Sequence, residues 1–142
     1  MTTGQTNLLK ALSSVNVSCD EVEYGFATIP FEMEMEIVIN DVLGTFKEAE
    51  GTTIIASKDY LSTKGIPFEG PFAKLTIDIH TSLELVGITA LLTNKLAEIG
   101  LPGNVVAAYY YDHVFVQYDL RHKAIEALNA MKEALVALKR DL

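Results

Sequence analysis

Apolar and polar residues recur with two different periods along the chain, and these periods predict which segments are strands and which are helices. In the first half, leucines at helical spacing predict a short helix over 5–14, and residues 22–30 predict a strand that Pro30 ends. The sequences TFKEA and TTIIA within 44–57 predict a β-hairpin, with Gly51 taking positive φ at its turn. The first half is therefore expected to supply a strand and a hairpin.

An acidic segment with a period of two lies between that strand and the hairpin. Glu32, Glu34 and Glu36 alternate with apolar residues, a pattern typical of extended or strand-like chain. One interpretation is a ladder of carboxylates that binds a hard cation, and the other is a half-exposed edge strand with a solvated acidic face. We expect the edge strand, because no glycine-turned loop or further oxygen ligand accompanies the ladder.

Residues 57–72 predict a brief helix and then a boundary. The sequence SKDYLSTKG is typical of a short helix that ends at Gly65. The sequence IPFEGPF at 66–72 contains two prolines and a glycine, and it is the best boundary in the chain. We therefore divide the chain into an N-terminal unit, 1–68, and a C-terminal unit, 69–142.

The clearest helix of the second half runs from Thr81 to Gly100. Thr81 and Glu84 form a capping-box pattern at its start, and Gly100, followed closely by a proline, is a C-terminal stop signal. Between these ends, apolar side chains recur at intervals of three and four and predict one buried stripe, made of Leu85, Ile88, Leu92, Leu96 and Ile99.

Strands and a second helix are expected around it. Alternation predicts a strand over 72–80 and another over 104–111, and VFVQY is a third strand that follows a tight turn near Asp112. The same alternation places the first and third tyrosines of 109–111 on one face, with one set of tyrosines packed under the helices. The last helix is expected over 121–140, with its inward face formed by Ile125, Leu128, Met131, Leu135 and Leu138.

The resulting order of strand, helix, strand, strand, helix predicts an α+β, ferredoxin-like fold that lacks its usual last strand. The helical crossover implies that strands 72–80 and 104–110 are parallel and are neighbours or near neighbours in a mixed sheet with antiparallel pairs and helices on one face. Because an open sheet edge is a liability, we expect the first half of the chain or a second subunit to cover it.

Charge and composition narrow the function classes. The formal net charge is −8 and the basic residues are scattered, so nucleic acid and anionic membranes are not expected partners. Cys19 is the only cysteine, which excludes an internal disulfide and is typical of a reduced cytosol. The N-terminus lacks the pattern of a secretory signal, and the longest uncharged stretch is too short to span a bilayer. We expect a cytoplasmic protein.

Adjacent acid–base residues at 111–113 suggest an enzyme as a second interpretation. Tyr111, Asp112 and His113, together with Glu84, are residues that a small enzyme could use. However, the three histidines of the chain are too dispersed for a metal site, and neither a Gly-x-Ser-x-Gly elbow nor a glycine-rich phosphate loop is present. The enzyme interpretation has residues that could act in catalysis, but they form no recognised catalytic motif. We therefore expect no catalysis, no cofactor and no metal.

The second half resembles small bacterial proteins with two ACT-type units, regulatory amino-acid-binding modules that also occur in aspartate kinases. The resemblance lies in HTSLELVG at 80–87, in Asn104-Val105, and in YYYDHVFV at 109–116. The first half is similar to the companion unit in EYGFATIP and TFKEAEGTTII. A weaker similarity extends to the mammalian cytosolic arginine sensor. Tyr111 stands where the family has a histidine, and this departure allows a different ligand.

The resemblance implies a regulatory module that binds a small amino acid between two ACT units, as a homodimer that acts on a protein partner. The start of a helix supplies unpaired amides for a carboxylate. Glu84 has two interpretations, as a capping residue or as a partner for a ligand ammonium, and Gly87 marks either a ligand or tight packing. The residues implied in binding are Thr81, Ser82, Leu83, Glu84, Val86, Gly87, Ile88, Asn104, Val105 and Asp112. A structural or interaction domain without a ligand remains the third alternative, and both cationic and leucine-like amino acids fit the sequence.

Overall fold

The computed structural model describes residues 15–33, 35–78 and 88–140. Within them the chain forms two compact units: residues 21–73 make one, and the described residues before and after that segment make the other. The predicted helix over 5–14 and the predicted helix start at 81–87 lie outside the described residues. Strand β5 (Glu69–Asp78) contributes to both units, because its first residues pair with one partner strand and its last residues with another.

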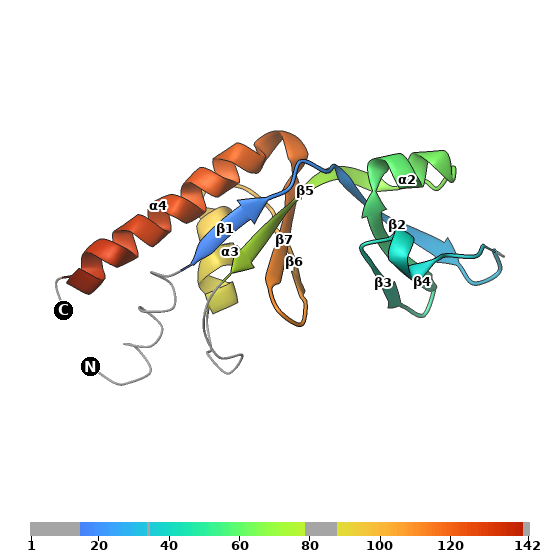
Figure 1. Ribbon diagram of the computed structural model, residues 1–142, viewed down its shortest axis with the longest axis horizontal. Helices are drawn as coiled ribbons and strands as arrows, with labels where there is room; N and C mark the ends of the chain where they lie inside the picture. The colour runs from blue at the N-terminus through green and yellow to red at the C-terminus, as the bar shows by residue number, and fades with distance from the viewer. Residues whose placement is uncertain (1–14, 34, 79–87, 141–142) are drawn as a thin grey trace. The chain divides into compact units, whose positions relative to one another are not determined.

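The unit of residues 21–73 is an antiparallel sheet with a short helix. Its strand order is β3-β4-β2-β5, and its other elements are β2 (Tyr24–Pro30), β3 (Gly44–Lys47), β4 (Gly51–Ser57) and α2 (Lys58–Thr63) (Figure 1). Helix α2 begins where the Ser57 hydroxyl accepts a hydrogen bond from the Tyr60 amide at 3.1 Å, and Gly65 follows it with φ of 69°. The predicted hairpin and brief helix are therefore confirmed.

The core of this unit lies between the sheet and α2. Every second residue is buried from Gly25 to Ile29 in β2 and from Ile54 to Ser57 in β4, which is the period of a sheet with one covered face. Burying these apolar side chains is the main contribution to the stability of the unit. The buried cluster consists of Ala27, Ile29, Ile54, Ala56, Leu61 and Ile66.

The described residues of the acidic segment form a turn and irregular backbone and no strand, so the edge-strand prediction is wrong. The Met33 amide donates to the Pro30 carbonyl at 3.0 Å, and a 3-10 turn covers Ile39–Asp41. Met35 and Ile37 pack against the buried cluster although the segment joins no strand ladder among the described residues. The alternating pattern thus arises because these two apolar side chains pack on the core. Strand β3 occupies the sheet edge where a further strand would have paired.

Gly51 is required for a reason that the sequence pattern does not show. It does not adopt the positive φ predicted for the hairpin turn. It is buried opposite Pro30 in the β2–β4 register, and a Cβ atom at this position would lie 2.5 Å from the Ile29 carbonyl oxygen. The glycine therefore permits two strands to approach closely, which is a common role of glycine within a sheet.

Among its described residues, the second unit also has four strands, in the order β1-β5-β7-β6. Its further elements are β1 (Asn16–Cys19), α3 (Ile88–Glu98), β6 (Asn104–Ala107), β7 (Asp112–Gln117), a 3-10 turn (Tyr118–Leu120) and α4 (Arg121–Arg140) (Figure 1). Strand β7 lies between β5 and β6, so the two strands joined by the crossover helix are near neighbours, as predicted.

Strand β1 covers the sheet edge that the second half alone would leave open. It pairs with β5 in antiparallel register, from Asn16 opposite Asp78 to Cys19 opposite Leu75. The expectation that the first half of the chain covers this edge is confirmed, although the sequence analysis did not predict a strand here. Helix α4 contacts β1, β7 and α3 and thereby closes the core of the unit.

The predicted helices of this unit are confirmed in their described parts. Leu92 and Leu96 of α3 and Leu128 of α4 are buried, as is Ala124, which the stripe prediction omitted. Gly100 ends α3 with φ of 77°, and the Leu101 amide donates to the Leu96 carbonyl at 2.9 Å. The structure does not describe the side chains of four other residues of the predicted stripes, Leu85, Ile88, Leu135 and Leu138.

Candidate functional site

Only some of the residues proposed to bind a ligand are among those that the structure describes. Residues 81–87, which hold six of the ten predicted positions, lie outside the described residues. Ile88 is the first residue of α3, Asn104 and Val105 begin β6, and Asp112 begins β7. The described geometry therefore concerns how the start of α3 lies relative to the β6–β7 hairpin.

Asp112 lies close to the start of α3. The Thr89 hydroxyl donates to the Asp112 carboxylate at 3.3 Å, and this exposed hydrogen bond joins the first described turn of α3 to the first residue of β7. The structure thus places one negatively charged group beside the first described turn of α3.

Asn104 lies at the other end of the hairpin. It pairs with Phe115, whereas Asp112 pairs with Ala107, so three register positions separate the two predicted site residues, a distance of about 10 Å along a strand. The residue before Asn104, Gly103, packs against Leu96 in the last turns of α3. Within this unit, Asn104 and Asp112 therefore do not face one common point.

The three tyrosines form the turn between β6 and β7. Strand β6 ends at Ala107, and the Ala108 amide donates to the Tyr111 carbonyl at 3.0 Å. Tyr109 and Tyr110 are each 81% exposed and Tyr111 is 43% exposed. The prediction that one set of tyrosines packs under the helices is wrong, because a turn does not alternate its side chains between two faces as a strand does.

His113 and Asp112 point to opposite faces of the sheet, because they are consecutive residues of one strand. Asp112 points toward α3, where its carboxylate accepts the hydrogen bond from Thr89. Val114, on the same sheet face, lies near Leu96 of that helix. His113 faces the other side, where its Nδ1 atom is 3.0 Å from the Thr76 hydroxyl. The adjacent Asp-His pair of the sequence is therefore not a hydrogen-bonded dyad.

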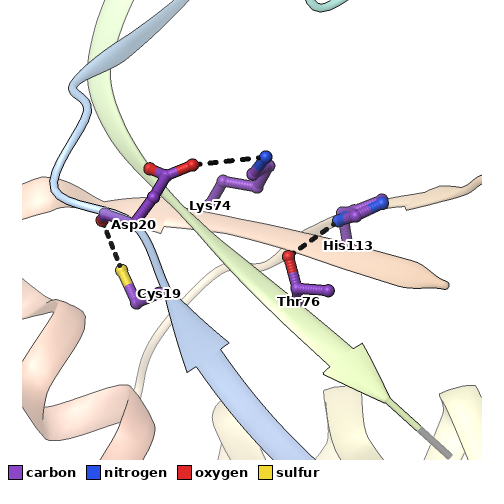
Figure 2. A network of polar contacts seen from close by, with 5 residues as sticks. All are labelled: Cys19, Asp20, Lys74, Thr76 and His113. Carbon is purple, nitrogen blue, oxygen red and sulfur yellow. Dashed lines mark hydrogen bonds and ion pairs between the residues drawn. The ribbon is translucent and has the colours of Figure 1, made fainter.

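A polar network surrounds His113 on the sheet face away from the helices. Figure 2 shows Thr76 and Lys74 on β5, His113 on β7, and Cys19 and Asp20 at the end of β1. Lys74 forms an ion pair with Asp20 at 3.3 Å, and its side chain is only 16% exposed. The Cys19 thiol donates to the Asp20 carbonyl at 3.1 Å.

This network shifts the titration of His113. Partial burial lowers the pKa of His113 below its usual value, and the nearby positive charge of Lys74 acts in the same direction. The carboxylates of Asp112 and Asp20 oppose this shift. The network joins residues from three strands, so only the strand pairing could have revealed it.

Two further features bear on ligands. A cavity of about 240 Å³ lies under the turn that follows β2, with Phe31, Met33, Met35 and Ile37 among its apolar lining residues. Within the described ranges, no three histidine, cysteine or acidic side chains come together as metal ligands. Nor is any helix of those ranges long and apolar enough to cross a membrane.

Comparison with known proteins gives the family. Two family models, each described as an ACT domain, match the chain at residues 3–73 and 68–130. A Vibrio cholerae protein of unknown function, also described as a possible transport protein, is 30% identical in sequence. The match covers 92% of this chain and 99% of that protein, with a TM-score of 0.79. A search of curated proteins gave no match.

More distant solved structures share the fold. An Agrobacterium tumefaciens protein is 16% identical, with a TM-score of 0.69 and coverage of 83% of this chain and 89% of that one. The regulatory subunit of aspartate kinase from Thermus thermophilus, in a ligand-free form, is 15% identical, with a TM-score of 0.53 and coverage of 82% and 95%. The predicted ferredoxin-like α+β fold is thus confirmed. The chain belongs to the ACT domain family and contains two ACT domains in tandem.

Proposed function

We propose that the protein is a non-catalytic regulatory module that binds a small amino acid at an interface between ACT units. ACT domains are regulatory modules that commonly bind amino acids. The observation that carries the proposal is the position of Asp112, whose carboxylate accepts a hydrogen bond from Thr89 at the start of α3. Asp112 thereby contacts α3, whose described part begins at Ile88, the residue that follows the predicted binding segment 81–87 in the sequence.

The two charges of an amino acid suit this arrangement. Backbone amides at a helix start bind an α-carboxylate, because they lack partners within the helix and lie at the positive end of its dipole. The carboxylates of Asp112 and Glu84 can accept hydrogen bonds from the α-ammonium group. Asn104 and Val105 would come from a second ACT unit, since Asn104 lies about 10 Å from Asp112 within its own hairpin.

The same geometry weakens the enzyme alternative. A general base requires a partner that orients it and a substrate within reach of its ring. His113 instead lies beside the Thr76 hydroxyl, and Asp112 points to the opposite sheet face. Tyr111, the third residue of that alternative, belongs to an exposed turn. These contacts support a structural role for His113 and leave Asp112 for a ligand.

Regulation would follow from a shift between two packings of the ACT units. A ligand changes such an equilibrium only if it binds one packing more tightly than the other. We propose that two copies of the chain form the relevant dimer, that a regulated protein partner in the cytoplasm reads its state, and that edge strand β6 takes part in the pairing. Val106 of β6 is exposed, and the strand carries no charged side chain that would oppose pairing.

A thermal-shift panel tests the proposal. A ligand that binds only the native state stabilises it by RT ln(1 + [L]/Kd), which is about 2.7 kcal/mol when its concentration is 100 times Kd. We expect at least one of the twenty amino acids to raise Tm at millimolar concentration. Gly87→Leu and Asp112→Ala should remove that rise, whereas Gly44→Leu, on an exposed part of the other unit with open space at its Cβ position, should keep it. A panel without any rise in Tm would contradict the proposal.

A further inference from the structure

A second cavity, of about 490 Å³, lies entirely within the unit of residues 21–73. It is formed by β2, the turn after β3, β4, and the segment that leads into β5 together with the first residue of that strand. Its volume is within the range of about 300–1,000 Å³ that is common for small-molecule sites. None of the residues assigned above to amino-acid binding lines it. This cavity therefore requires a separate explanation.

The apolar wall of the cavity is aromatic and held in place. Phe26 packs edge-to-face against Phe72, with ring centroids 5.4 Å apart and planes at 81°. Phe68 lies against Gly25, where a Cβ atom would be 2.6 Å from the Phe68 ring, so only a glycine leaves room for this ring position. Edge-to-face packing is a favourable geometry for aromatic pairs, and it leaves the face of a ring open to other contacts.

The polar wall of the cavity is acidic. Glu48 and Glu69 both line it, and no lysine, arginine or histidine is among the described residues around it. The Thr53 hydroxyl donates a hydrogen bond to Glu48 Oε1 and so fixes that carboxylate at the wall. Glu69 is paired with Phe26 in the β2–β5 register, which places the second carboxylate beside the aromatic wall.

We propose that this cavity binds a small organic cation, an ammonium group attached to an apolar or aromatic body. The two carboxylates would pair with the ammonium group, and the phenylalanine faces would attract the cation and cover its apolar body. An anion is disfavoured by both walls. A neutral apolar molecule would use only the phenylalanines and would leave the two carboxylates without a cationic partner.

Titration of the full-length, ¹⁵N-labelled protein with phenethylammonium tests this assignment by NMR. We expect saturable shifts of the amides of Phe26, Thr28, Thr53 and Glu69. The uncharged analogue 2-phenylethanol should bind about tenfold more weakly, because it lacks the ion-pair and cation–π contacts. Equal affinity for 2-phenylethanol, or for the anion 3-phenylpropionate, would overturn the proposal, as would the absence of any saturable shift.

Charge-neutral variants identify the carboxylates responsible. Glu48→Gln and Glu69→Gln should each weaken phenethylammonium binding about threefold, the effect of removing one partly exposed ion pair. Glutamine at position 48 can still accept from Thr53, so the turn should remain folded. The control Glu50→Gln removes the same charge from the same exposed turn but from outside the cavity, and it should leave the affinity unchanged. An identical loss of phenethylammonium affinity in all three variants would show a general charge effect and contradict specific binding in this cavity.

Discussion

Replacing Gly51 by alanine should destabilise the unit of residues 21–73. The added Cβ would lie 2.5 Å from the Ile29 carbonyl oxygen, 3.0 Å from the Ile29 carbonyl carbon and 3.1 Å from Pro30 Cα. Carbon–oxygen contacts between strands are ordinarily about 3.3–3.6 Å, so the carbonyl would have to move by about 1 Å. All three atoms belong to the backbone of β2, and the strand itself would have to shift.

The size of the effect follows from two opposing terms. Overpacking of a fixed interior costs about 1–3 kcal/mol. Alanine also restricts the unfolded chain, which offsets the cost by about 0.4–1 kcal/mol. The free energy of unfolding of Gly51→Ala should therefore fall by about 1–2 kcal/mol relative to the wild type.

Gly44 in β3 supplies the matched control. It lies in the partner strand of the same hairpin, its φ is not positive, and no atom lies within 4 Å of its Cβ position. Gly44→Ala should therefore be neutral or stabilising by up to about 1 kcal/mol. Urea unfolding, followed by hydrogen exchange of amides in β4, measures both variants. Equal free energies of unfolding for Gly51→Ala and Gly44→Ala would refute the close-approach argument.

Three further predictions concern the second unit. His113 has a lowered pKa in the folded state, so the unfolded state binds more protons and the contribution of His113 to stability is lost as pH falls below about 6.5. His113→Gln should therefore remove part of this acid loss of Tm. Lys74→Gln should raise the pKa of His113 in an NMR titration, because it removes a nearby positive charge, and an unchanged or lower pKa would contradict that cause. Gly100→Ala should lower the stability by about 1 kcal/mol, because alanine is strained at φ of 77°, and an unchanged urea midpoint would count against this reason.

Local signals in the sequence predicted the local structures well. The α2 end at Gly65, the α3 end at Gly100 and the hairpin of 44–57 each depend on residues within a few positions of one another. Strand β1 could not be found this way, because its four residues acquire a partner only through β5, more than fifty residues later in the chain. The period of apolar residues indicates which side chains of a strand are buried. It does not indicate which other strand pairs with it.

The wrong strand prediction at 32–36 has the same cause as the strand that was predicted to run to Tyr111 but ends at Ala107. Alternation in the acidic segment and in 104–111 indicated extended chain, but a strand also needs a hydrogen-bonding neighbour. Met35 and Ile37 alternate because they anchor a turn-rich segment, and the tyrosines of 109–111 lie in the turn between β6 and β7. Because tyrosine is common in strands, three consecutive tyrosines favoured a strand prediction over a turn.

The candidate site was predicted in part. The sequence pointed to Asp112, and the hydrogen bond from Thr89 now connects it with the start of α3. The network of Lys74, Asp20 and Thr76 around His113 was missed, because it assembles from residues far apart in the chain. The division of the chain at 68/69 stays a prediction, and so do the binding roles of all ten predicted residues, Asn104, Val105 and Asp112 included.

Titration of the twenty amino acids into the ¹⁵N-labelled protein tests amino-acid binding most directly. The proposed function predicts that at least one amino acid produces saturable shifts of the amides of 81–88, with further shifts at Asn104, Val105 and Asp112. Absence of saturable shifts with all twenty at millimolar concentration would contradict the central claim. Saturable shifts confined to other residues would contradict the proposed site.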